Sequence, residues 1–143
     1  MASPPLTNRE YAYFSVKGNG NSNFVSSILK IEPTNQWSQG ELNSRNNLPR
    51  KSMSWNLESG LDDTHPIEKH IERLLEILEP LENELAKLSK NYEVYIQCVG
   101  YFPASSYGLS VSKNLIEKLH RLSLSLDYDF YFVEDYGHDL DYH

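Results

Sequence analysis

The segment from Pro66 to Lys90 constrains the fold more than any other part of the sequence. Apolar residues recur in it at spacings of three and four, namely Ile67, Ile71, Leu74, Leu75, Leu78, Leu81, Leu85 and Leu88. This spacing gathers them on one face of an α-helix and leaves the charged residues on the other face. Pro80 lacks the N–H that a helix interior needs, so a kink or a restart as a second helix is expected there.

Alternation of apolar and polar residues predicts strands elsewhere in the chain. The expected strands are 11–16, 52–57, 92–99, 109–111 and 124–132. Two shorter apolar faces predict helices near 23–31 and 113–122, with Ser22 and Ser112 as their N-caps. The residues between 32 and 51 are mostly polar and predict a long irregular connection.

The predicted order of elements is therefore β-α-β-α-β-β-α-β, which indicates an α+β fold. We expect a two-layer sandwich with a mostly antiparallel or mixed sheet and helices on one of its faces. A chain of 143 residues fits one domain, 1–143. Its expected core is about 10–133, preceded by an N-terminal arm, 1–9, and followed by an acidic C-terminal tail, 134–143.

Charge and cysteine content exclude several classes of function. The net charge of −7 and the pI near 5.2 disfavour nucleic-acid binding, which depends on positive charge. Cys98 is the only cysteine, so no intramolecular disulfide and no CxxC site can form. The sequence begins without a signal-peptide pattern and has no apolar run of the roughly 20 residues that a membrane helix needs. We expect a cytoplasmic protein without cofactor or bound metal.

The sheet face turned away from the helices is the first candidate binding surface. The strand alternation places six polar or aromatic side chains on it, namely Tyr13, Tyr95, Gln97, Asp127, Asp129 and Tyr131. Ten of the residues are Tyr, which combines an apolar ring with a hydroxyl and suits interfaces. Strand propensity alone is an alternative reason for many of these tyrosines.

The connection 32–51 supplies a second candidate, a pocket for a small ligand. Trp37 in this connection, together with Trp55, Gln97 and Tyr101, is expected to line it between the loop and the sheet. In the alternative interpretation Trp37 simply covers one end of the core.

A third candidate is the pair Asp127 and Asp129. Alternate residues of one strand lie about 6.5–7 Å apart, a separation that suits a shared metal or acid–base chemistry. Charges on an edge strand that prevent aggregation explain the pair equally well. Cys98 falls in the apolar phase of its strand, where cysteine is usually buried and inert. We therefore expect no catalytic residues and no enzyme.

Several stretches resemble a bacterial family catalogued as domain of unknown function 4279. The similar stretches are Tyr11–Gly18, Ile31–Glu41, Ser54–Gly60, Ile96–Tyr101 and Leu109–Lys113, which together span about residues 10–133. The resemblance implies a bacterial source and carries no established activity.

Modest size, acidic charge and many tyrosines favour a binding module with a basic protein as its partner. One example is an immunity-type protein that neutralises a cationic toxin. The alternatives are a small-ligand sensor that uses the pocket around Trp37 and an enzyme that uses Asp127 and Asp129. The oligomeric state stays open.

Overall fold

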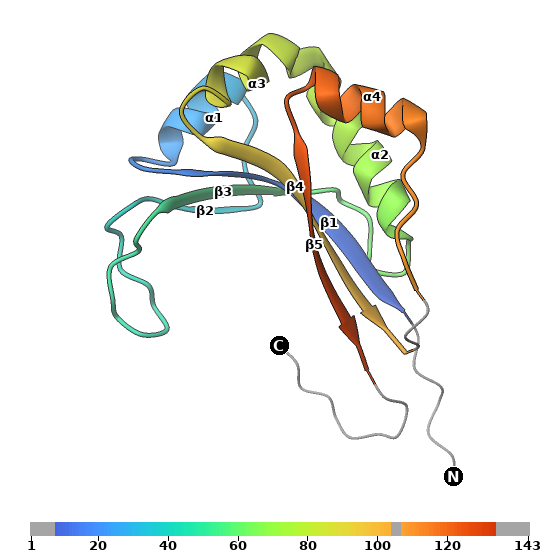
Figure 1. Ribbon diagram of the computed structural model, residues 1–143. Helices are drawn as coiled ribbons and strands as arrows, with labels where there is room; N and C mark the ends of the chain where they lie inside the picture. The colour runs from blue at the N-terminus through green and yellow to red at the C-terminus, as the bar shows by residue number, and fades with distance from the viewer. Residues whose placement is uncertain (1–7, 104–106, 134–143) are drawn as a thin grey trace.

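A mixed five-stranded sheet with helices packed against one face forms the protein, as the sequence predicts (Figure 1). The computed structural model describes residues 8–103 and 107–133. Its elements are β1 (Arg9–Gly18), α1 (Asn23–Leu29), β2 (Asn35–Trp37), β3 (Met53–Glu58), α2 (Ile67–Leu78), the 3₁₀ turn η1 (Glu79–Leu81), α3 (Glu82–Leu88), β4 (Glu93–Phe102), α4 (Lys113–Arg121) and β5 (Ser125–Phe132).

The strands lie in the order β2-β3-β1-β4-β5, which places the first strand of the chain at the centre. β1 is antiparallel to both β3 and β4, and β2 is antiparallel to β3. β5 runs parallel to β4. Parallel neighbours need a crossover connection, and α4 lies within that connection.

The core lies between the helices and the facing side of the sheet. Phe14 of β1 and Trp55 of β3 are both fully buried, and their rings meet edge to face at 5.9 Å between centroids. The indole N–H of Trp55 donates to Ser26 Oγ of α1 at 2.9 Å, so its polar atom is satisfied inside the core. The apolar stripe of α2 covers this layer with the buried residues Ile67, Ile71, Leu74, Leu75 and Leu78.

The interruption expected at Pro80 is confirmed. α2 ends at Leu78, and Pro80 sits in η1 before α3 begins at Glu82. The cap predicted at Ser112 is also confirmed, because its hydroxyl accepts a hydrogen bond from the N–H of Leu115 at 3.2 Å. Ser22 occupies the N-cap position of α1 but makes no capping bond, and its hydroxyl instead lies 3.2 Å from Ser38 Oγ.

Two details of the predicted element order were wrong. The connection 32–51 contains the short strand β2. Only three residues of this mostly polar segment pair with β3, so its sequence shows no apolar alternation that would indicate a strand. Conversely, Leu109 and Val111 form no strand, although both pack against the core. β4 already has β1 on one side and β5 on the other, so the sheet offers them no edge at β4.

The last strand also differs from its prediction. Its apolar side faces the helix layer, yet Tyr128 is 50% exposed and Phe132 is 46% exposed. Only Leu126 and Phe130 on this side of β5 are partly buried against the core. The apolar alternation therefore continues along an edge strand whose helix side is only partly buried.

No helix within residues 8–103 and 107–133 combines the length and apolar character that crossing a bilayer requires. Most of the arm expected at 1–9 and all of the acidic tail expected at 134–143 lie outside the described residues.

The position of Phe14 predicts a large stability effect. We expect Phe14→Ala to lower the free energy of unfolding by about 3–5 kcal/mol, because it leaves a cavity against Trp55 at the centre of the sheet. Ile116→Ala is the control, because Ile116 on α4 is 55% exposed, and it should change stability by less than about 0.5 kcal/mol. Urea denaturation of both variants measures the difference, and equal effects would contradict the assignment of the core.

Candidate functional site

One face of the sheet carries no helices (Figure 1) and is here called the open face. It gathers side chains from all five strands. Paired residues project from the same side of a sheet, and side chains alternate along each strand. The register therefore fixes the members of the open face, which are Asn35 and Trp37 of β2, Ser54, Asn56 and Glu58 of β3, Arg9, Tyr11, Tyr13, Ser15 and Lys17 of β1, Glu93, Tyr95, Gln97, Val99 and Tyr101 of β4, and Ser125, Asp127, Asp129 and Tyr131 of β5.

A buried hydrogen-bond network holds the part of the open face formed by β1, β2 and β3. Ser15 Oγ donates to Asn56 Oδ1 at 2.7 Å. The side-chain amide of Asn56 donates to Asn35 Oδ1 at 2.8 Å and to Ser54 Oγ at 3.0 Å. Ser15, Ser54 and Asn56 are all buried, so these bonds satisfy polar groups that water does not reach. The network fixes the short strand β2 against β3.

Tyrosine rings and cations occupy the part of the open face on β1, β4 and β5. Tyr101 and Tyr131 stack with ring centroids 4.9 Å apart. The guanidinium of Arg9 lies 5.1 Å from the Tyr101 ring centre, and the Lys17 ammonium lies 6.0 Å from that of Tyr95. These cation–π contacts hold the rings in defined positions.

The hydroxyls of Tyr11 and Tyr13 on the open face remain protonated at neutral pH. Burial, followed by the neighbouring Tyr95, raises the pKa of Tyr13 to about 12. Burial and the nearby Tyr101 likewise raise the pKa of Tyr11. Each hydroxyl can therefore donate a hydrogen bond as well as accept one.

Asp127 and Asp129 form an acidic strip on the exposed side of β5. Asp129 Oδ2 accepts a hydrogen bond from the buried Gln97 amide at 3.2 Å. Asp127 Oδ1 accepts from the backbone N–H of Tyr128 at 3.1 Å. Both side chains are exposed, and neither forms an ion pair with another described residue. Their negative charge is therefore available to a partner.

Cys98 lies behind this strip, on the helix side of β4. Burial, followed by the charge of Asp127, raises the pKa of its thiol to about 12. The thiolate is the reactive form, so Cys98 is inert near neutral pH. Its place in the buried phase of the strand agrees with the sequence prediction.

The structure brings most of the predicted site residues to one face. Trp37, Tyr95, Gln97, Tyr101, Asp127, Asp129 and Tyr131 all belong to the open face. Trp55 does not, because it is fully buried on the helix side. Trp37 and Tyr101 stand on β2 and β4, with β3 and β1 between them, so they do not line one pocket with Trp55. Trp37 instead stacks under the guanidinium of Arg50, 4.0 Å from its ring centre.

Sequence reasoning missed Arg9, Tyr11 and Lys17, which share the open face with the predicted residues. Tyr11 belongs to the alternation predicted for 11–16, whereas Arg9 and Lys17 lie outside that predicted strand and within the longer β1 of the structure. Their neighbours were not visible in the sequence, because only the pairing of β1 with β4 brings Arg9 to Tyr101 and Lys17 opposite Glu93.

A hollow of about 480 Å³ adjoins the start of β4. Lys17, Glu93, Tyr95 and Asp127 of the open face contribute to its lining, together with Tyr92 and Ser123. It therefore offers positive, negative and hydroxyl groups side by side. It is not the pocket predicted around Trp37.

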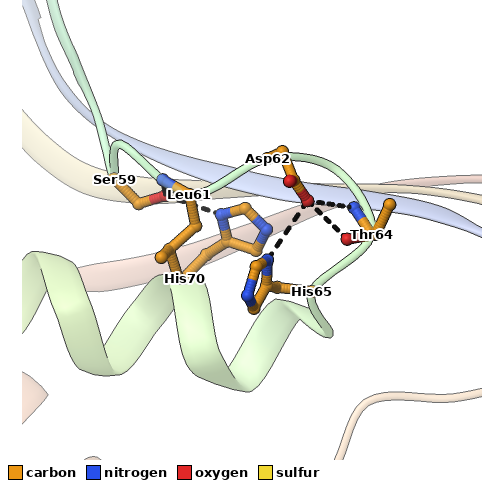
Figure 2. A network of polar contacts seen from close by, with 6 residues as sticks. All are labelled: Ser59, Leu61, Asp62, Thr64, His65 and His70. Atoms are coloured by element: carbon orange, nitrogen blue, oxygen red, sulfur yellow. Dashed lines mark hydrogen bonds and ion pairs between the residues drawn. The ribbon is translucent and has the colours of Figure 1, made fainter.

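A second polar network joins the end of β3 to α2 (Figure 2). Ser59 Oγ lies 2.6 Å from Nδ1 of His70, and the N–H of Leu61 donates to the same oxygen at 3.2 Å. The tautomer of the imidazole decides which of these two atoms donates, and the other ring nitrogen of His70 is Nε2. That nitrogen is buried and has no hydrogen-bond partner among the described residues. Ser59 is only 4% exposed, and its bond to His70 links the end of β3 to α2.

Asp62 organises the turn ahead of α2. Its Oδ1 accepts hydrogen bonds from the backbone and hydroxyl of Thr64 and lies 3.2 Å from Nδ1 of His65. The hydrogen bonds from Thr64 lower the pKa of Asp62. His65 lies two residues before Ile67, the first residue of α2, and its ring meets that of His70 edge to face with centroids 6.4 Å apart. Within residues 8–103 and 107–133, no three His, Cys, Asp or Glu side chains gather as metal ligands.

The burial of His70 predicts a pH-dependent stability. Burial lowers the pKa of His70. The nearby backbone groups of His65 and Glu10 act in the opposite direction and only partly offset this shift. The unfolded chain, with a histidine pKa of about 6.5, therefore binds the proton first as the pH falls. We expect the free energy of unfolding to decrease below about pH 6.5 by at most about 1.4 kcal/mol per pH unit, until the folded state also binds the proton.

His70→Asn is the matched variant, because the amide oxygen can still accept from Ser59 and does not titrate. Urea denaturation at about pH 7.5 and about pH 5.5 should show a larger loss of stability in the natural chain than in the variant. Parallel losses in both proteins would assign the pH dependence to other groups.

Comparison with known proteins gives one match. The family model described as Domain of unknown function (DUF4279) matches residues 8–133. No curated protein and no solved structure matches the chain. The matched range contains every strand and helix described above, including the whole open face. The chain therefore belongs to the DUF4279 family, as its sequence motifs indicate.

Proposed function

We propose that this protein is a small binding module whose open face covers a positively charged surface of a partner protein. One observation carries the proposal, namely that the exposed carboxylates of Asp127 and Asp129 lie beside the stacked rings of Tyr101 and Tyr131. In its sharper form, the protein is a cytoplasmic bacterial immunity-type protein, and the partner is a cationic toxin whose active site it covers.

The open face has the chemistry of an interface centre. Tyrosine is enriched at the energetically dominant positions of protein interfaces because it buries a large rigid ring and still forms a hydrogen bond. The hydrogen-bond network around Asn56 and the cation–π contact of Arg9 hold this face before any partner arrives. A surface that is already ordered loses less entropy on binding.

The charge distribution favours a basic partner. The chain carries a net charge of −7, and neither Asp127 nor Asp129 forms an ion pair with another described residue. Arg9, in contrast, pairs with Asp63 at 2.9 Å and stacks on Tyr101. Complementary charge accelerates association and selects between partners.

A catalytic function has less support. The thiol of Cys98 and the hydroxyl of Ser59 are both buried, and the strand spacing of Asp127 and Asp129 suits binding as well as catalysis. We therefore propose binding, not catalysis, as the role of the open face.

Charge reversal tests the proposal. Affinity capture at low salt from the host's own lysate, followed by mass spectrometry, first identifies the basic partner. We then expect the double variant Asp127→Lys and Asp129→Lys to slow association about tenfold or more at low salt and to flatten its salt dependence. Surface plasmon resonance at several salt concentrations measures both effects.

The matched control is Glu72→Lys with Glu76→Lys, which makes the same change in net charge on the exposed side of α2. It should leave the fast association largely intact. Equal slowing by both double variants would mean that net charge acts without a defined surface, and unchanged kinetics in the Asp variants would remove the open face from the interface.

The hollow near Lys17 favours a second candidate function, a sensor of a small polar ligand. If this is correct, a metabolite screen will find a compound that raises the melting temperature, and the shift will grow with concentration. Lys17→Gln should reduce the shift, because Lys17 supplies the cation of the hollow. A broad screen without any shift, or a shift that is the same in Lys17→Gln, would count against this site.

A further inference from the structure

β5 is the only long free edge in the described sheet. It ends the strand order β2-β3-β1-β4-β5 and extends for eight residues, whereas the strand at the other edge, β2, has three. A free edge presents unpaired backbone N–H and C=O groups to which another strand can add.

The outward groups of this edge can be identified from one hydrogen bond. Val133 N–H donates to Phe102 C=O of β4 at 2.8 Å, so Val133 directs its backbone groups towards β4. Backbone groups alternate along a strand, and the register with β4 is unbroken from Ser125 to Phe132. The backbone N–H and C=O groups that point to the free edge are therefore those of Leu126, Tyr128, Phe130 and Phe132. The contact from Tyr128 N–H to its own neighbour Asp127 agrees with this assignment.

Aromatic side chains flank the edge on the helix side. Tyr128 and Phe132 are 50% and 46% exposed, and Tyr107, which stacks on Phe102 at 4.6 Å, is 46% exposed. Phe130 and Phe132 also contact Phe102, with ring centroids 5.4 and 5.7 Å apart. Phe102 at the centre of this aromatic cluster is buried, while Tyr107, Tyr128 and Phe132 around it remain exposed.

The open-face side of the same strand is acidic. Asp127 and Asp129 project there, followed by Tyr131. β5 thus presents an apolar aromatic row on one side of its edge and a carboxylate row on the other.

We propose that an extended segment of a basic protein partner adds to β5 as a further strand, with cationic side chains over Asp127 and Asp129 and apolar side chains against Tyr128 and Phe132. This inference rests on the proposed function and specifies how the partner binds. The negative charges of Asp127 and Asp129 favour a partner strand that carries positive charges. Opposite charges across neighbouring strands stabilise a sheet, while like charges destabilise it.

A second copy of the chain fits this edge less well. It would bring another pair of Asp127 and Asp129 close to the first and would join two chains that each carry a net charge of −7. Charged residues on edge strands commonly prevent such self-pairing. The same carboxylates therefore discourage a second β5 and attract a cationic strand.

The probe is a peptide of alternating Lys and Val with about the length of β5, eight residues. Added to the ¹⁵N-labelled full chain at low salt, it should shift the amide resonances of Ser125–Phe132 in a concentration-dependent way. A peptide of alternating Glu and Val should cause no such shifts, and added salt should weaken the Lys peptide because it screens the charges.

Tyr128→Pro tests the backbone contribution. Proline removes the N–H that points to the free edge and leaves the bonds to β4 in place, so the fold should persist while peptide binding is lost. Tyr128→Thr keeps the N–H and removes the ring, so it should weaken binding less. Thermal unfolding checks that the variants fold, and Phe132→Pro, at the last residue of β5, replaces Tyr128→Pro if that variant does not.

Three results would overturn the inference. In the first, the Lys peptide binds Tyr128→Pro as well as it binds the natural chain. In the second, the amide resonances that the peptide shifts lie outside β5. In the third, sedimentation shows that the natural chain is a dimer and that Tyr128→Pro is a monomer. If the captured partner depends on Asp127 and Asp129 but not on the N–H of Tyr128, the proposed function stands and only strand addition fails.

Discussion

The burial of β1 between β3 and β4, beneath α2, is the constraint on which the rest of the structure depends. Phe14 and Val16 are fully buried on its helix side, and the strand forms ladders with neighbours on both edges. Successive side chains of a strand point to opposite faces of the sheet, so burial of one set against the helices directs the other set to the opposite face. Tyr11, Tyr13, Ser15 and their cross-strand neighbours must then face away from the helices. The open face is a direct consequence of packing the core.

The open face divides into two parts with different physical character. Around Asn56 the polar groups are buried and mutually satisfied, so this part stabilises the sheet and has little capacity left for a partner. Around Tyr101, Tyr131 and the carboxylates of β5 the groups are more exposed. Binding capacity therefore concentrates towards β5. The edge of this strand adds unpaired backbone groups to the charges and rings.

Comparison of prediction and structure shows where each kind of information lies. The stripe of α2, the break at Pro80 and the cap at Ser112 are local, because each depends on residues within a few positions of one another. β2 was not predicted, because it is a strand through its pairing with β3 and its own composition does not indicate one. A strand was predicted at Leu109 and Val111, but they form none. Apolar alternation indicates that these side chains are buried, but it cannot show that a strand edge is available for pairing.

Periodicity and motifs were enough to predict the fold class, the family and the two-sided character of the strands, because both are local properties of the chain. Tertiary structure decided which of those sides meet. It placed Trp55 on the helix side, bonded to Ser26 of α1, and Trp37 on the open face. It also set Tyr101 against Tyr131 and Asp129 beside Gln97. It left Tyr128 and Phe132 exposed on the edge strand β5, although Phe130 between them packs against the core. Long-range strand order carries this information, and no local pattern in the sequence encodes it.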